Sequence, residues 1–228
     1  MRKILNILLN CWFPKVCSAC NRSLSLYEAG LCFYCAQYLH KTNHFEKRNN
    51  ALYVQLAYRM SIHSVQSLYF FQPKSIEQRA IHELKYKKNI QIGHFFGKEM
   101  GKSLLNAPWL KDVDLLVPIP LHPNKELERG YNQSRVLCEG ISEETELPIS
   151  MVLKKQQAGK GATKGNRMER MSSRKIDFQL NTKIPFGTQH ILIVDDVITT
   201  GATLESALHV IRKEFQGKIS VVSIAHTF

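Results

Sequence analysis

The sequence has no hydrophobic run long enough to cross a membrane. Its apolar stretch near the start, Ile4 to Phe13, is interrupted by Asn6 and Asn10 and covers about ten residues, whereas a membrane span needs roughly 20. Arg2 and Lys3 precede this stretch, as basic residues do in a signal peptide, but no small-residue cleavage site follows. We therefore expect a cytoplasmic protein without membrane insertion, whose first residues form a short helix packed on the core.

Acidic residues are few compared with basic ones. The 19 Asp and Glu face 31 Lys and Arg, which gives a formal net charge of +12. Such a charge attracts polyanions and phosphorylated metabolites alike, and a basic surface also simply aids solubility, so the charge alone identifies no partner. Internal repeats are absent as well, and the 44% hydrophobic and 22% charged content is that of an ordinary globular protein rather than a disordered chain.

Short apolar runs alternate with helical patterns along most of the chain. The apolar runs lie at 54–58, 65–71, 114–119, 191–194 and 219–225, and the helical patterns at 75–86, 92–105, 130–144 and 202–214. This alternation favours an α/β fold with a mostly parallel sheet flanked by helices. A polar stretch, 41–50, separates a cysteine-rich module at 1–45 from a larger domain at 46–228, in which 46–75 reads as a hairpin or hood.

Five of the six cysteines lie within the first 45 residues. Cys17 and Cys20 form one CxxC pair and Cys32 and Cys35 a second, with eleven residues between the pairs. Two such pairs complete a tetrahedral set of thiolates for Zn²⁺, and a closed Cys₄ site leaves no open position for catalysis. We expect structural zinc; the module then either contacts nucleic acid or serves only as a folding staple.

The most informative segment joins an apolar run to a helix. Ile191 to Val194 precede Asp195 and Asp196, and a Thr/Gly-rich turn then opens the helix at 202–214. The turn contains Thr199, Thr200, Gly201, Ala202 and Thr203. A helix N-terminus at the carboxyl end of a parallel strand presents free N–H groups to an anion, and the two carboxylates suit sugar hydroxyls and a hydrated Mg²⁺. The order of apolar run, acids, turn and helix fits the binding of a sugar 5-phosphate.

This segment resembles the signature of type I phosphoribosyltransferases, in which hydrophobic residues are followed by two acids and TTGAT. The resemblance implies a type I phosphoribosyltransferase-like fold that binds phosphoribosyl diphosphate (PRPP). The 5-phosphate would lie on the loop from Thr199 to Thr203. Asp195 and Asp196 would act as the catalytic pair. They would hold the ribose hydroxyls, and they would bind Mg²⁺ directly or through water. In that family the reaction transfers a pentosyl group, and the protein chiefly positions its reactants and stabilises charge.

Three further segments resemble the ComF family of competence proteins. They are Val117 to His122, Arg129 to Gln133, and Glu169 with Arg170, and the leading cysteine module completes the pattern over nearly the whole chain. By similarity, Pro120, Leu121 and His122 would lie where diphosphate binds, although a proline-rich turn also explains them. Lys85 matches a basic position of the family and is otherwise an exposed helix lysine. Arg129 and Gln133 either reach the same pocket or begin a helix.

A basic, glycine-containing segment at 154–175 reads as a flexible loop. Its candidate contact residues include Lys164, Arg167 and Arg170. The loop either closes over a diphosphate, follows a nucleic-acid backbone, or is simply solvated.

The ComF resemblance implies a role in DNA uptake and natural transformation through the handling of single-stranded DNA. A competence helicase or another DNA-uptake protein is then an expected partner, and the oligomeric state is open. The alternative is an active phosphoribosyltransferase of nucleotide metabolism or salvage whose acceptor the sequence does not identify.

Overall fold

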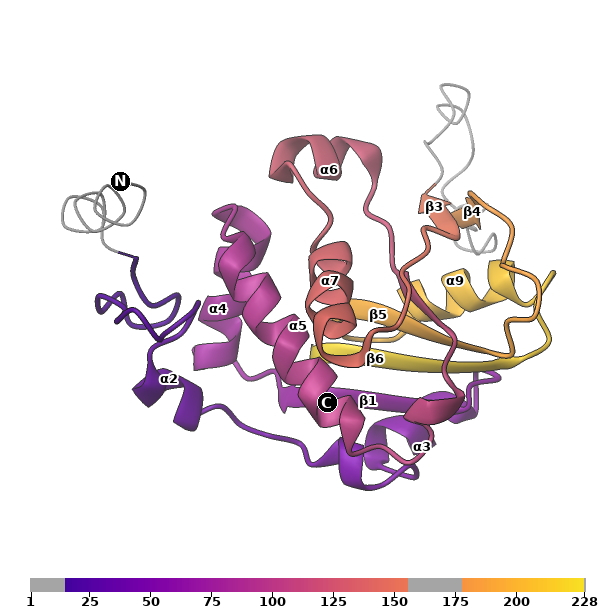
Figure 1. The fold of residues 1–228 in the computed structure, drawn as a ribbon, viewed down its shortest axis with the longest axis horizontal. Coiled ribbons are helices and arrows are strands. Elements are labelled where there is room, and N and C mark those ends of the chain that lie inside the picture. The colour runs from indigo at the N-terminus through magenta and orange to yellow at the C-terminus, as the bar shows by residue number, and fades with distance from the viewer. Residues whose placement is uncertain (1–14, 156–177, 228) are drawn as a thin grey trace, which may run out of the picture.

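The computed structural model describes residues 15–155 and 178–227 (Figure 1). Its centre is a four-stranded sheet of order β1-β6-β5-β2, in which every pair of neighbours is parallel. The strands are β1 (Ser64–Phe70), β2 (Leu115–Pro118), β5 (His190–Ile198) and β6 (Lys218–His226). The predicted α/β class with a parallel sheet is confirmed.

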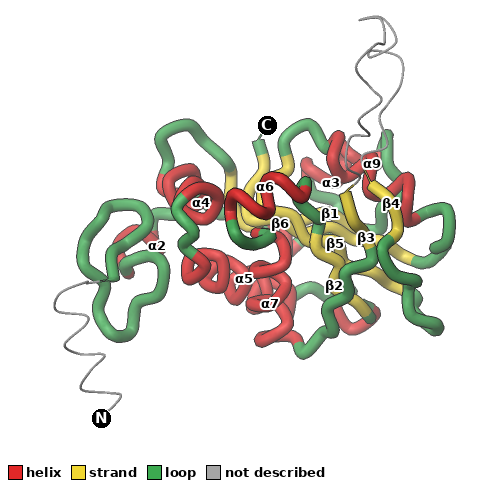
Figure 2. The backbone as a smooth tube through the Cα atoms, turned by 90° about the horizontal axis from the view of Figure 1, so that it is seen from above, coloured by secondary structure: helices red, strands yellow, loops and turns green. Residues whose placement is uncertain are grey.

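Helices cover both faces of the sheet (Figure 2). Helices α4 (Ile76–Tyr86), α5 (Ile90–Leu105) and α7 (Gln133–Thr145) lie on one face, and α3 (Ala51–Ala57) and α9 (Ala202–Ile211) on the other. Alternate residues of β5 divide between the two cores: Leu192 and Val194 pack with the first group, and Ile191 and Ile193 with the second. The near-continuous apolar run of this strand therefore reflects burial on both faces.

Helices α5 and α7 cross at two glycines. A Cβ placed on Gly97 would lie 2.6 Å from the carbonyl oxygen of Leu137 and 2.9 Å from the Cα of Gly140. No other residue fits this close approach without displacing backbone. The contact allows the backbones of α5 and α7 to approach each other closely.

The helices predicted within the described residues are confirmed, with boundaries that differ by up to three residues. Helix α4 begins as expected after Ser75, whose Oγ accepts a hydrogen bond from the Gln78 N–H at 3.1 Å. The helix predicted from Gly130 instead starts at Gln133, because Gly130 adopts a left-handed φ of +83° and ends the additional helix α6 (Pro123–Arg129).

The prediction of a hairpin or hood within 46–75 is wrong. Residues 51–57 form α3 rather than a strand, because Leu52 and Leu56, one helical turn apart, are both fully buried. Asn50 caps this helix through a 2.9 Å bond from the Tyr53 N–H. The next strand, β1, pairs with β6 in the main sheet rather than with a partner in its own segment.

The predicted basic loop is entered and left by a small antiparallel pair, β3 (Leu153–Lys155) and β4 (Phe178–Leu180). Lys164, Arg167, Glu169 and Arg170 lie outside the described residues, as does the predicted helix at the start of the chain.

The cysteine module contains the short helix α2 (Phe33–Gln37). The buried residues of the module, including Leu31 and Leu39, belong to the same core as Ile81 and Leu84 of α4 and the buried residues of α5. The boundary near residue 45 stays a prediction.

Two short 3₁₀ helices, His44–Glu46 and Leu110–Asp112, complete the elements of the described chain. None of the helices in the described ranges is long and apolar enough to cross a membrane.

Candidate functional site

Two adjacent carboxylates lie near the carboxyl end of β5. Asp195 is 8% exposed, and its Oδ1 accepts the Asp196 N–H at 2.8 Å. Burial, followed by the charge of Asp196, raises the pKa of Asp195 to about 7. Two crowded acids of this kind lack a full set of counter-charges, and a divalent cation with oxygen ligands would supply them.

Two helices bring polar groups to this acid pair. Lys85, in the last turn of α4, places its Nζ 3.1 Å from Asp196 Oδ2, and Ser134, in the first turn of α7, places its Oγ 3.4 Å from Asp195 Oδ1. The structure thus brings Lys85, which the family resemblance singled out, to the predicted acids. The side chains of Lys85 and Asp196 are 24% and 15% exposed, so this ion pair is only partly screened by water.

The Thr/Gly-rich turn leads directly from β5 into α9. Gly201 has a left-handed φ of +79° and precedes the helix without a side-chain cap. Thr199, Thr200 and Thr203 are exposed, and within the described residues no partner accepts the N–H of Gly201 or of Thr203. Free N–H groups at the start of a helix favour an anion. An open pocket of about 430 Å³ is lined by Thr199 and Thr200 together with Gln55, Arg59 and Thr227.

Pro120, Leu121 and His122 follow β2, the strand that neighbours β5, so they leave the sheet at the same edge as the acids. The Ile119 N–H still bonds to the Val194 carbonyl at 3.0 Å. His122 caps α6, because its Nδ1 accepts the Asn124 N–H at 3.3 Å. Pro120 and Leu121 line an open pocket of about 630 Å³ that Lys154 and Lys155 also border.

Arg129 and Gln133 contact each other rather than the acid pair. Arg129 Nη1 donates to Gln133 Oε1 at 2.8 Å, and its guanidinium lies 5.2 Å from the centre of the Tyr86 ring. Gln133 is 1% exposed, and its Nε2 has no partner within the described chain. Both predicted readings of these residues, as pocket groups and as helix-start groups, remain predictions.

Sequence reasoning missed two residues of this edge. One is Ser134, which the fold brings to Asp195 across 61 positions. The other is Arg59, in the turn after α3, whose Nη2 donates to the Thr200 carbonyl at 2.7 Å across 141 positions. The only sequence signal was the position of Ser134 directly after the Arg129–Gln133 motif; Arg59 had none.

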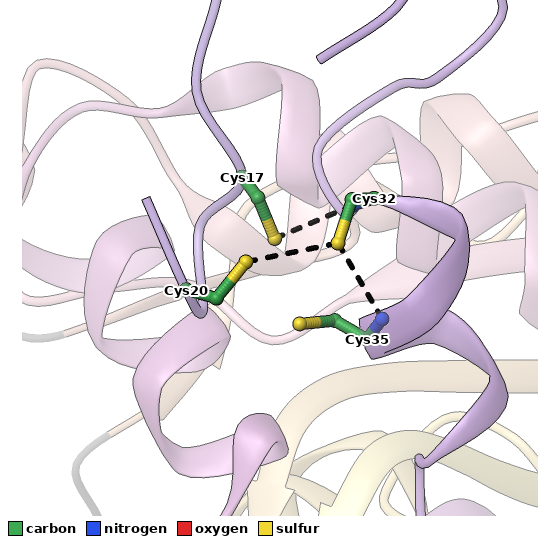
Figure 3. Close-up of side chains that lie close together, drawn as sticks. All are labelled: Cys17, Cys20, Cys32 and Cys35. Atoms are coloured by element: carbon green, nitrogen blue, oxygen red, sulfur yellow. Dashed lines mark hydrogen bonds between the residues drawn. The ribbon is translucent and has the colours of Figure 1, made fainter. Parts of the chain in front are cut away.

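The four predicted cysteines form one cluster (Figure 3). Their Sγ atoms all lie within 4.8 Å of one another, and Cys20 Sγ is 3.7 Å from Cys32 Sγ. That separation is far too long for a disulfide and close to the roughly 3.8 Å edge of a tetrahedron with Zn–S bonds of about 2.3 Å. Burial raises the pKa of Cys17, but N–H donors from Cys32, Ala19 and Cys20 outweigh it and lower the pKa to about 7. The arrangement fits a tetrahedral metal.

No family model matches the sequence. The chain is similar to several bacterial proteins. Competence protein ComFC of Bacillus subtilis is 25% identical over 210 residues, which cover 92% of this chain and 82% of that protein. Competence protein F of Haemophilus influenzae is 26% identical over 162 residues, 69% of each chain. DNA utilization protein YhgH of Escherichia coli is 26% identical over 157 residues, 64% of this chain and 66%, just under two thirds, of that protein.

Solved structures with detectable likeness include enzymes named for phosphoribosyl chemistry. The glutamine phosphoribosylpyrophosphate amidotransferase of B. subtilis is 16% identical, with a TM-score of 0.39, over 59% of this chain and 27% of that chain. The hypoxanthine phosphoribosyltransferase of Trypanosoma cruzi is 17% identical, with a TM-score of 0.38, over 62% of this chain and 75% of that chain.

Proposed function

We propose that this homologue of the ComF-type competence proteins handles single-stranded DNA during DNA uptake and natural transformation, and that it binds PRPP with Mg²⁺. The role in DNA uptake is supported by relatives named for competence and for DNA utilization. The net charge of +12 favours a polyanionic partner. A cytoplasmic location and contact with a competence helicase or another DNA-uptake protein belong to the same proposal.

The observation that carries the PRPP site is the meeting of two crowded carboxylates, a lysine and an uncapped helix start at one edge of the sheet. Asp195 and Asp196 would hold the ribose hydroxyls and the Mg²⁺, directly or through water. The turn from Thr199 to Thr203 would bind the 5-phosphate through its N–H and hydroxyl groups. Lys85 would stabilise the negative charge of the diphosphate once the cation takes its place beside Asp196.

Zn²⁺ is proposed as the occupant of the cysteine cluster, where it would serve the fold rather than catalysis. All four available positions of a tetrahedral ion would be taken by Cys17, Cys20, Cys32 and Cys35. Mass spectrometry of the native protein should find one zinc per chain. Zinc content near zero in a folded protein would contradict this assignment.

The alternative function is phosphoribosyl transfer to a nitrogenous base. It is favoured by one observation, the pKa of about 7 at Asp195, because a carboxylate in that range can accept a proton from a reactant near neutral pH. Acceptor-dependent release of diphosphate would establish transfer. Binding of PRPP with no release in the presence of purine or pyrimidine bases would favour a ligand-binding protein.

The first experiment is calorimetric titration of the zinc-loaded protein with PRPP and Mg²⁺, followed by the double variant Asp195→Asn/Asp196→Asn. Loss of binding in the folded variant supports the site, whereas absence of binding to the wild type would refute it. Retention of a single-stranded oligonucleotide is measured in parallel. Affinity that falls steeply with salt and survives the double variant supports a separate DNA surface.

A further inference from the structure

Arg59 contacts the phosphate loop through a backbone carbonyl and lines an open pocket together with Thr199 and Thr200. It lies in the turn after α3, and its Nη2 donates a 2.7 Å hydrogen bond to the carbonyl oxygen of Thr200. Such a bond from a charged donor is stronger than a neutral one. The contact spans 141 positions, so it forms only when the fold is complete.

The bond sets the orientation of one peptide group. The described chain contains no cis peptide, and in a planar trans peptide the N–H points opposite to the preceding carbonyl. With the Thr200 carbonyl bound to Arg59, the Gly201 N–H points away from Arg59. This N–H has no partner among the described residues, as expected of a donor kept for a ligand.

Side chains beside Arg59 support the same arrangement. A Cβ on Gly201 would lie 2.8 Å from Leu56 Cδ2 and 3.0 Å from Met60 Cε. Leu56 and Met60 are themselves buried, at 0% and 5% exposure. The loop is thus pressed against the end of α3, and the Arg59 bond fixes which way its central peptide faces.

We propose that Arg59 is a positioning residue for binding of a phosphate monoester: it orients and polarises the Thr200–Gly201 peptide so that the Gly201 N–H donates to the 5-phosphate. This inference rests on the proposed PRPP site. The pocket lined by Arg59 lies on the carbonyl side of this peptide, whereas the Gly201 N–H points to the opposite side. In this proposal Arg59 therefore acts through the peptide and not by direct contact with the phosphate, and its effect is confined to the phosphate-loop end of the ligand.

The test compares Arg59→Met with Arg48→Met. Arg48 is a matched control, because it is also exposed and its Nε also donates to a backbone carbonyl, that of His63, at 2.8 Å, but at the other edge of the sheet. Each zinc-loaded protein is titrated with ribose 5-phosphate and, separately, with inorganic diphosphate. We expect Arg59→Met to weaken ribose 5-phosphate binding about 10- to 100-fold and to leave diphosphate binding unchanged. Arg48→Met should change neither, and Arg59→Lys should recover part of the loss.

Three results would overturn the inference. If Arg59→Met binds ribose 5-phosphate as the wild type does, only the role of Arg59 is refuted, and the proposed site stands. Equal weakening of both ligands indicates a general structural effect instead. A wild-type protein that binds neither ribose 5-phosphate nor PRPP refutes the proposed site, and the role of Arg59 with it. Amide exchange in the ligand-free protein adds a second readout: it should quicken at residues 199–203 in Arg59→Met only.

Discussion

The two edges of the parallel sheet are both rich in charged and polar side chains, yet they use them differently. At the carboxyl edge, two carboxylates are adjacent, and the N–H groups of Gly201 and Thr203 lack partners within the described chain. At the amino edge, a larger open pocket of about 980 Å³ is lined by basic, acidic and histidine side chains. The volume of a pocket therefore does not by itself identify which edge binds a ligand.

At the amino edge most charges are already bound to the protein itself. Arg212 donates to the carbonyls of Ser61, Phe215 and Gly217. Asp114 accepts the N–H groups of Gln189 and His190 at 2.7 and 2.9 Å. His190 is 1% exposed, and burial lowers its pKa to about 4, so it is neutral at physiological pH. Charges bound to the surrounding backbone stabilise a fold, whereas two adjacent carboxylates that share one nearby lysine indicate a ligand.

The sharpest test replaces one carboxylate at each edge of the sheet and compares the two variants. Asp196→Asn should weaken PRPP and Mg²⁺ binding by at least about 100-fold, roughly 2.7 kcal/mol, without lowering stability, because it removes charge from a crowded pair. Asp114→Ala should do the opposite, lowering the melting temperature and leaving ligand affinity unchanged. Calorimetry and thermal melts of both variants check this. Equal effects on binding would abolish the distinction between the edges.

Arg212→Ala should cause the largest loss of stability. Its guanidinium joins α9 to the turn at Phe215–Gly217 and to Ser61, and removal would leave three carbonyls without a donor. We expect a loss of about 3 kcal/mol in the free energy of unfolding, measured by urea denaturation. Arg212→Lys should recover only part of it, since lysine lacks the planar fork. A ligand affinity that falls in the folded variant would contradict a purely structural role.

The contribution of the carboxyl edge to the free energy of unfolding should fall as pH rises. The folded pKa of Asp195, about 7, exceeds the roughly 3.9 of an unfolded aspartate, so the folded state holds the proton more tightly. Its contribution is present below about pH 4 and is lost as pH rises through 7. Asp195→Asn should therefore raise the unfolding free energy at pH 8 by roughly 2 kcal/mol. A variant less stable at pH 8 than the wild type would show that the carboxylate is structurally required.

The amino edge should respond to pH in the reverse sense. The pKa of His190, about 4, lies below the roughly 6.5 of an unfolded histidine, so the unfolded state binds the proton first. The contribution is present above pH 6.5 and is lost as pH falls towards 4. His190→Gln should reduce the loss of stability between pH 7 and 5 by about 1 kcal/mol. The exposed His209 provides the control, and an identical slope in His190→Gln and His209→Gln would count against this account.

The smallest effect is expected from Lys218→Ala. Lys218 forms an exposed ion pair with Asp112 at 3.2 Å, and water screens such pairs strongly. We expect a change in melting temperature of less than about 2 °C and no change in ligand affinity. A larger shift would mean that the amino edge depends on its surface charges as well as on its backbone contacts.

The sequence predicted what depends on local order and missed what depends on distant contacts. The strand, acids, turn and helix from Ile191 onward form one continuous segment, so their arrangement could be predicted. Val54 and Tyr58 suggested a strand, but burial of Leu52 and Leu56 on one helical face overrides that propensity. Arg59 then went unnoticed, because its role requires α3 to be a helix beside the phosphate loop.

The buried carboxylate of Glu77 has a consequence for the autonomy of the cysteine module. Glu77 lies in the first turn of α4 and is fully buried. Its Oε1 accepts the backbone N–H of His40 and lies 3.1 Å from the ring Nδ1 of that residue. A cut near residue 45 would remove this partner and expose the shared core around Leu84. We therefore expect a cysteine module cut out near residue 45 to lose part of its core, so that its transfer to another protein would have to include α4 and α5.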